Sequence, residues 1–154
     1  MQDRSLSAVP ALTPPQLKKA LVAHGFEIFR TLPEEIVLAE RPRENLILDS
    51  GVRVGTIDAG FRVRVVLRAQ QADFPHEKEA ELFARVRNLA IPALEDGFVE
   101  QSTQVNSVKD PADAERTLDT FYELFLAREV ATLDEAMPLV KFALALEKAV
   151  ATGR

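Results

Sequence analysis

The sequence predicts an α+β protein in which an antiparallel meander sheet of about five strands is packed on one face by helices. Residues 61–68 alternate apolar side chains with arginines, as expected of a strand with one buried and one wet face. Short apolar runs separated by turn residues precede this strand. Links this short require antiparallel neighbours, which excludes a doubly wound nucleotide-binding fold. Helical spacing at both ends of the chain adds an N-terminal helix and two C-terminal helices.

Length and composition limit the possible domain organisation of the chain. Its 154 residues, 47% of them hydrophobic, can bury a core of their own. We expect residues 1–12 to form a flexible N-terminal tail and residues 13–151 to form a single α+β domain. There is no cysteine, which excludes disulfides, thiolate metal sites and a cysteine nucleophile. Apolar stretches are too short for a signal peptide or a membrane span, so we expect a cytoplasmic protein without a membrane partner.

The charge pattern argues against nucleic acid as a partner. The net charge is −5, and residues 76–154 carry the whole acidic excess. An acidic chain repels the phosphate backbone, so we expect no binding of nucleic acid.

The first helix is predicted over residues 14–24. Thr13 can cap it, Gln16 can complete a capping box, and Pro14 suits the first helical position. Gly25 follows at the position where a left-handed residue commonly ends a helix.

The meander is predicted from extended runs between turn residues. In the last of these runs Val63, Val65 and Leu67 lie with Phe61 on the buried side. A later segment, residues 98–108, has few apolar side chains and is predicted to be an edge strand. The predicted strands of the meander are 26–30, 35–40, 46–49, 52–58 and 61–70.

Three further helices follow from helical spacing of apolar residues. The first spans residues 76–91 and is stopped or kinked by Pro92. The second is predicted over residues 110–129, because an Asp-Pro pair begins it and large apolar residues recur at helical spacing. The last begins at or after Thr132 and is apolar on most sides over residues 139–150. Either this domain or a second copy of the chain must cover it.

The arginines of the long strand are candidates for binding an anion. Arg62, Arg64 and Arg68 share the wet face, and Arg53 can join them from a neighbouring strand. An anionic ligand or an acidic peptide would suit such a face. The alternative is that they are solvated positions of a half-buried strand, paired with nearby glutamates.

Catalytic and metal-binding signals are weak. His24 and His76 are the only histidines, they stand apart, and zinc needs about four ligands at defined spacing. The acidic pairs at 34–35, 95–96 and 134–135 fall at turns or helix starts, where carboxylates favour the local dipole. Acid–base catalysis would need carboxylates that converge in a cleft. We therefore expect no enzyme, no metal and no cofactor.

Two features suit binding to another polypeptide. The polar run at residues 98–108 could accept an added strand, and the last helix could form half of a helix–helix interface. A protected edge and an internal core helix are the alternatives. The candidate partner-binding residues are Val99, Gln101, Thr103, Val105, Phe142 and Leu146.

Three segments carry a resemblance to a known family. They are residues 13–28, with Thr-Pro-Pro-Gln-Leu and His-Gly-Phe-Glu-Ile, residues 82–88, and residues 110–125, with Asp-Pro and Leu-Asp-Thr-Phe-Tyr-Glu-Leu-Phe. Together with the element order, they make the chain similar to the YbjN-type bacterial sensory transduction regulators and the type III secretion chaperone-like fold. The resemblance implies a small, acidic, usually dimeric protein that holds segments of other polypeptides without catalysis.

The sequence thus favours a non-enzymatic protein-binding module, a homodimer in a chaperone, adaptor or regulatory role. The alternative is a small-molecule or anion-binding regulatory domain that uses the arginine-lined sheet face.

Overall fold

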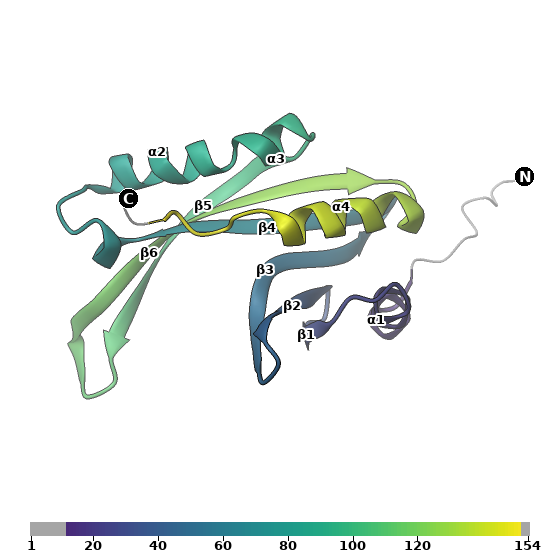
Figure 1. Ribbon diagram of the computed structural model, residues 1–154, viewed down its shortest axis with the longest axis horizontal. Helices are drawn as coiled ribbons and strands as arrows, with labels where there is room; N and C mark the ends of the chain where they lie inside the picture. The colour runs from purple at the N-terminus through teal and green to yellow at the C-terminus, as the bar shows by residue number, and fades with distance from the viewer. Residues whose placement is uncertain (1–11, 152–154) are drawn as a thin grey trace, which may run out of the picture. The chain divides into compact units, whose positions relative to one another are not determined.

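The computed structural model describes residues 12–151 and confirms the α+β class. The predicted tail, residues 1–12, lies outside the described residues except for its last residue. Within the described part, six antiparallel strands form one sheet in the order β1-β2-β3-β4-β6-β5 (Figure 1). The strands are β1 Ile28–Thr31, β2 Glu35–Arg43, β3 Leu46–Ile57, β4 Gly60–Gln70, β5 Val99–Asp110 and β6 Asp113–Val130. The helices are α1 Pro14–Ala23, α2 Glu79–Leu89, α3 Ile91–Glu95 and α4 Leu133–Ala145, with a 3-10 turn, η2, at Gln71–Asp73.

The described residues divide into two compact units. One holds residues 12–63 and 129–144, and the other holds residues 64–128 and 145–151. β4 and β6 contribute residues to both units.

In the first unit, α1 forms as its end signals predict. The Thr13 side chain accepts a hydrogen bond from the Gln16 backbone, and the Gln16 side chain accepts one from the Thr13 backbone at 2.8 Å. Gly25 has a φ of 91°, which favours glycine after the helix. Leu17 and Leu21 are buried and join the helix to the core of this unit.

The meander of the first unit corrects one prediction. Residues 46–49 and 52–58 are not separate strands, because β3 runs through both. The backbone bends where Gly51 has a φ of 82°. The Ser50 hydroxyl donates to the Leu38 carbonyl at 2.7 Å and accepts from the Val52 amide at 3.1 Å. These hydrogen bonds keep β3 continuous across Ser50-Gly51, although this pair of residue types is typical of turns.

Gly60, at the turn between β3 and β4, permits a close backbone approach. A Cβ atom there would lie 2.1 Å from the Val130 carbonyl oxygen, so no other residue fits without a shift of the backbone. The end of β6 can therefore pass directly over the turn.

α4 begins as predicted but ends earlier. The Thr132 hydroxyl accepts from the Glu135 amide at 3.2 Å, and the Glu135 carboxylate accepts from the Thr132 amide at 3.1 Å, which forms the predicted capping box. The helix ends at Ala145, so the prediction of a helix to residue 150 is wrong.

In the second unit, residues 148–150 are extended and pair with β4. The Arg68 amide donates to the Lys148 carbonyl at 2.9 Å, and the Val150 amide donates to the Arg68 carbonyl at 3.0 Å. These bonds satisfy backbone groups that a longer α4 would have kept within the helix.

The main correction concerns residues 110–129, which form a strand instead of the predicted helix. The fold therefore has one C-terminal helix after this segment instead of two. β6 buries Tyr122, Leu124 and Leu126 at alternate positions, the period of a strand. Asp110 begins a hairpin turn, in which its carboxylate accepts from the Ala112 amide at 2.9 Å. The Asp-Pro pair thus starts a turn, a role that it fills as readily as a helix start.

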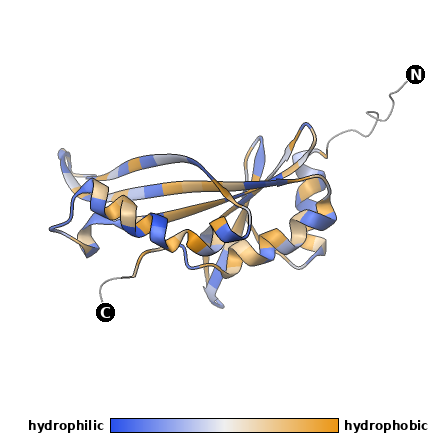
Figure 2. Cartoon of the chain, turned by 90° about the horizontal axis from the view of Figure 1, so that it is seen from above, coloured by the Kyte–Doolittle hydropathy of each residue, from blue (hydrophilic) through white to orange (hydrophobic). Residues whose placement is uncertain are grey.

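α2 covers one face of β6. Leu82 and Val86 are buried, and the Phe83 ring meets the Tyr122 ring edge-on at 5.5 Å. α2 ends at Leu89, and Pro92 lies in the first turn of α3, as the prediction of a stop or kink requires. Figure 2 shows hydrophobic and hydrophilic residues interleaved along helices and strands, the pattern of elements with one buried face.

Candidate functional site

β5 is the most exposed regular element of the described chain. It stands at one end of the sheet order, and β6 is its one strand neighbour among residues 12–151. Every β5 residue except Asp110 is exposed. The prediction that residues 98–108 form an edge strand is confirmed. An edge strand presents a row of backbone donors and acceptors that another chain can pair with.

The side chains of β5 do not protect this edge. Residues 101–108 contain no charged residue, no proline and no glycine. Proteins usually block exposed edges with lysines, prolines or very short strands. Instead β5 exposes three valines, with 62% of Val99, 45% of Val105 and 41% of Val108 accessible. We call the outer side of residues 99–110, whose centre lacks such protection, the β5 edge.

The pairing with β6 makes the centre of β5 regular. Residues 102–108 pair with β6 without interruption, from Ser102 opposite Phe125 to Val108 opposite Asp119, and the register shifts on either side of this stretch. Thr103 and Val105 lie opposite Leu124 and Tyr122, on the face that α2 covers, which we call the helix face.

The other face of this unit carries the arginines of β4, and we call it the arginine face. Gln104 and Asn106 of β5 lie there, opposite Glu123 and Phe121. An added strand would therefore place alternate side chains on two chemically different faces.

The arginine face is occupied by its own contacts. The Arg64 guanidinium lies 5.4 Å from the centre of the Phe125 ring, and its Nε donates to Gln101 Oε1 at 3.2 Å. Arg68 lies 5.4 Å from the centre of the Phe121 ring, with its Nη2 3.6 Å from the nearly buried Glu123 carboxylate. Such cation–π contacts hold the guanidinium groups beside the aromatic rings of β6.

In the first unit, Arg62 is paired as well, with its Nη2 2.6 Å from Glu129 Oε2. Arg53 donates to Asp49 on its own strand at 3.0 and 2.9 Å. The four arginines proposed for anion binding therefore have carboxylate, amide or aromatic partners, which favours the interpretation as paired strand positions. The sequence did not reveal the partners Glu123 and Phe125, because β6 was expected to be a helix.

An ion pair ties the start of β5 to α2. Arg87 donates to both carboxylate oxygens of Glu100, at 3.1 and 3.0 Å. These hydrogen bonds hold the pKa of Glu100 below its usual range, although partial burial opposes the shift. The charge of Glu100 is thus matched within the chain, and the β5 edge gains no net charge from it.

The far end of the β5–β6 hairpin is exposed on both strands. All of residues 107–118 except Asp110 are exposed, and half of Leu118 is accessible. Figure 1 shows this end running away from α2. Polar contacts cross the ribbon, such as Lys109 Nζ donating to Thr117 Oγ1 at 2.7 Å. We call residues 107–118 the hairpin arm.

The α4 candidates are less accessible than those of β5. Phe142 and Leu146 are half-buried, and Leu146 lies beyond the end of the helix. Val140 and Ala143, which belong to the first unit, are fully buried. This burial favours the interpretation of α4 as a core helix.

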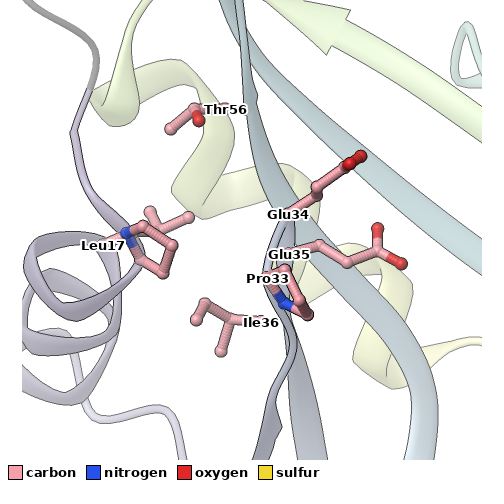
Figure 3. Close-up of a pocket in the computed structure, with 7 residues that line it drawn as sticks. Leu17, Pro33, Glu34, Glu35, Ile36 and Thr56 are labelled. Atoms are coloured by element: carbon pink, nitrogen blue, oxygen red, sulfur yellow. The ribbon is translucent and has the colours of Figure 1, made fainter.

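Two pockets lined by described residues lie in the first unit. The larger, of about 540 Å³, is lined by His24, Phe26, Asp134, Met137, Pro138 and Lys141. The smaller, of about 240 Å³, lies between α1 and the start of β2. Figure 3 shows Leu17 and Ile36 facing this hollow, while the carboxylates of Glu34 and Glu35 point away from it. Its lining residues are Pro14, Leu17, Pro33, Glu34, Glu35, Ile36 and Thr56.

The histidines and acidic residues do not assemble a metal site within residues 12–151, where no three metal-ligating side chains of His, Cys, Asp or Glu come together. His24 ends α1, with its Nδ1 3.0 Å from the Ala20 carbonyl oxygen. His76 lies in a turn before α2.

No family model, no curated protein and no solved structure matches this chain. The resemblance to YbjN-type regulators and secretion chaperones therefore stays a prediction. None of the helices among the described residues has the length and apolar character needed to cross a membrane.

Proposed function

We propose that this chain is a non-enzymatic protein-binding module of the cytoplasm, which takes an extended segment of another polypeptide as an added strand at the β5 edge. It would serve its partner as a chaperone, adaptor or regulator. The observation that carries the proposal is the exposed β5 strand, which has no charge, proline or glycine over residues 101–108. Edges of this kind are those to which a second chain adds readily.

The two faces of the sheet determine which side chains the added strand should carry. Backbone hydrogen bonds supply affinity in strand addition, and alternate side chains supply specificity. On the helix face the neighbours are Thr103 and Val105, which suit β-branched side chains. On the arginine face the neighbours are Gln104 and Asn106, whose carboxamides both donate and accept hydrogen bonds. The best partner is an uncharged segment that alternates β-branched and amide or hydroxyl residues.

The engaged arginines support strand addition over the anion-binding alternative. An anion at Arg64 or Arg68 would have to displace the contacts with Phe125, Gln101, Phe121 and Glu123. A strand added at the β5 edge pairs with the outward backbone of β5 and leaves these arginine contacts in place.

The test is affinity capture from native cell lysate with the intact chain and two lysine variants. Val105→Lys places a charge at the centre of the β5 edge. Leu118→Lys is the matched control, because Leu118 is exposed to a similar extent, 50% against 45% for Val105, but lies in β6. Proteins captured by the unmodified chain and by Leu118→Lys should be lost with Val105→Lys, since a charge on an edge strand opposes pairing. Circular dichroism should show both variants folded.

Identical capture by the two lysine variants would show that β5 is not the binding surface. The proposal would then fail, whatever proteins are captured.

A further inference from the structure

We infer that the strand added at the β5 edge is β5 of a second copy of this chain, paired antiparallel about a two-fold axis at Val105. This inference rests on the proposed function, because it requires that β5 accepts a strand, and it names the occupant.

Symmetry restricts the register of such a pair. Two antiparallel strands of one sheet are related by a two-fold axis perpendicular to the sheet, so each residue and its copy point to the same face. A residue can therefore lie opposite itself or opposite residues an even number of positions away. The uninterrupted stretch of β5 is residues 102–108, and its midpoint is Val105. Centring the axis there uses the whole regular stretch in both copies.

The pairs that this register produces over residues 103–107 are complementary. Val105 meets Val105 of the second copy on the helix face, where 45% of its surface is now accessible. Thr103 meets Ser107, which pairs two hydroxyls on the same face. Gln104 meets Asn106 on the arginine face, and each carboxamide supplies the donor and the acceptor that the other needs. Each of these unlike pairs occurs twice, once on either side of the axis.

The charges around the contact allow two acidic chains to approach. Each copy carries a net charge of −5, yet residues 101–108 carry none. Glu100 is neutralised by Arg87, and Asp110 lies 3.7 Å from Arg116. Lys109, directly after this stretch, donates to Thr117 Oγ1 within its own hairpin. Charges elsewhere in the chain act over longer distances, where salt screens them within about 8–10 Å.

Pairing with a second copy would stabilise the base of the hairpin arm. An isolated two-stranded ribbon is marginally stable in water, and three or more strands are needed for independent stability. In the paired form residues 107 and 108 lie beside residues 103 and 102 of the second copy. The base of the arm would then belong to a ribbon of four strands.

The first test is the mass of the purified chain in solution over a concentration series. The unmodified chain should show twice its 17.1 kDa at the upper end of the series. Val105→Lys and Val105→Glu should each stay monomeric, because the axis places like charges opposite each other. A 1:1 mixture of the two variants should regain the dimer, since a lysine then faces a glutamate. Leu118→Lys should dimerise like the unmodified chain.

The second test fixes the register by cysteine cross-linking, which is clean because the chain has no cysteine of its own. Val105→Cys should form a cross-linked dimer under mild oxidation or with a short bis-maleimide. Thr103→Cys alone should not, because in this register its two copies are about 13 Å apart along the strand. Ser107→Cys alone should not for the same reason, whereas a mixture of Thr103→Cys and Ser107→Cys should cross-link.

Three outcomes would overturn the inference. They are a monomeric mass for the unmodified chain throughout the series, a dimer that persists in both Val105→Lys and Val105→Glu, and cross-linking centred on another residue. A monomer whose capture of other proteins is still lost with Val105→Lys would refute self-pairing and leave the proposed function standing. Capture unaffected by Val105→Lys would refute the proposed function instead.

Discussion

At the scale of single residues, arginine is the main cross-linking side chain of the second unit. Arg85 lies 4.2 Å from the centre of the Phe74 ring while it donates to both oxygens of Glu77 at 2.7 and 2.6 Å. Arg64, Arg68 and Arg87 also lie over phenylalanine rings. A planar guanidinium covers an apolar ring and keeps its donors for a carboxylate or an amide.

The Arg85–Glu77 pair predicts a pH-dependent contribution to stability. The hydrogen bonds from Arg85 lower the pKa of Glu77 below its ordinary value, against a smaller effect of burial. A lowered pKa means that the pair stabilises the fold above the unfolded-state pKa, about 4.3, and that this contribution is lost as the pH falls through the folded-state value. Denaturant unfolding should therefore show a stability difference between the unmodified chain and Glu77→Gln at pH 7 that shrinks as the pH falls below 4.3.

Arg85→Gln should remove the same pH-dependent contribution, and the double variant should add little to it. A stability difference that stays constant from pH 7 to about pH 3 would contradict the role of this ion pair.

Sequence reasoning succeeded at single residues where the signal is local. Thr13 with Gln16 and Thr132 with Glu135 form the predicted capping boxes, which depend on residues three positions apart. Val63, Val65 and Leu67 are fully buried, as the alternation of their strand predicts. The partners of Arg64 and Arg68 could not be predicted, because they come from strands far along the chain and depend on the sheet order.

At the scale of elements, β6 shows where spacing alone misleads. Leu118, Phe121, Tyr122 and Phe125 are three and four positions apart, as on a helix, but Tyr122, Leu124 and Leu126 alternate, as on a strand. Both patterns are present because both faces of the strand are covered at its centre, one by α2 and one by arginines of β4. Pairing with its neighbours in the sheet decides in favour of the strand, as tertiary context commonly overrides local preference.

The edge position of the candidate site could be predicted from the sequence, but the hairpin arm beside it could not. The edge position of β5 follows from its own polar composition. The hairpin arm could not be predicted from the sequence, because its second strand, β6, was expected to be a helix.

The hairpin arm predicts uneven amide exchange along one strand. Residues 113–118 of β6 are exposed, whereas Leu124, Leu126 and Ala127 are buried. Low local burial permits local opening. Hydrogen–deuterium exchange followed by mass spectrometry should show faster exchange in residues 113–118 than in residues 122–127. The second half of the strand is the internal control. Equal protection in both halves would contradict local opening of the arm.

At the scale of the whole molecule, the two compact units share strands. β4 and β6 each run from one unit into the other, so neither unit can lose these strands while the other keeps them intact. We expect a single cooperative unfolding transition.

Core truncations in either unit should therefore shift one common transition. Leu38→Ala removes a fully buried side chain of the first unit, and Leu124→Ala removes one of the second. Each should lower the free energy of unfolding by about 2–5 kcal/mol. Denaturant unfolding followed by far-UV circular dichroism and by Tyr122 fluorescence should give coincident curves in both variants. Two separated transitions would show that the units unfold independently.

The two ends of the sheet order are unequal in length, and this bounds the assembly that strand addition can build. β1 offers four residues, whereas β5 offers twelve. If β5 pairs with β5 of a second copy, only the short edge strand β1 is left, and it is a poor template for a third chain. Growth would stop at a closed pair, and a strand with an uncharged centre, which could otherwise start a fibre, would be covered by its own copy.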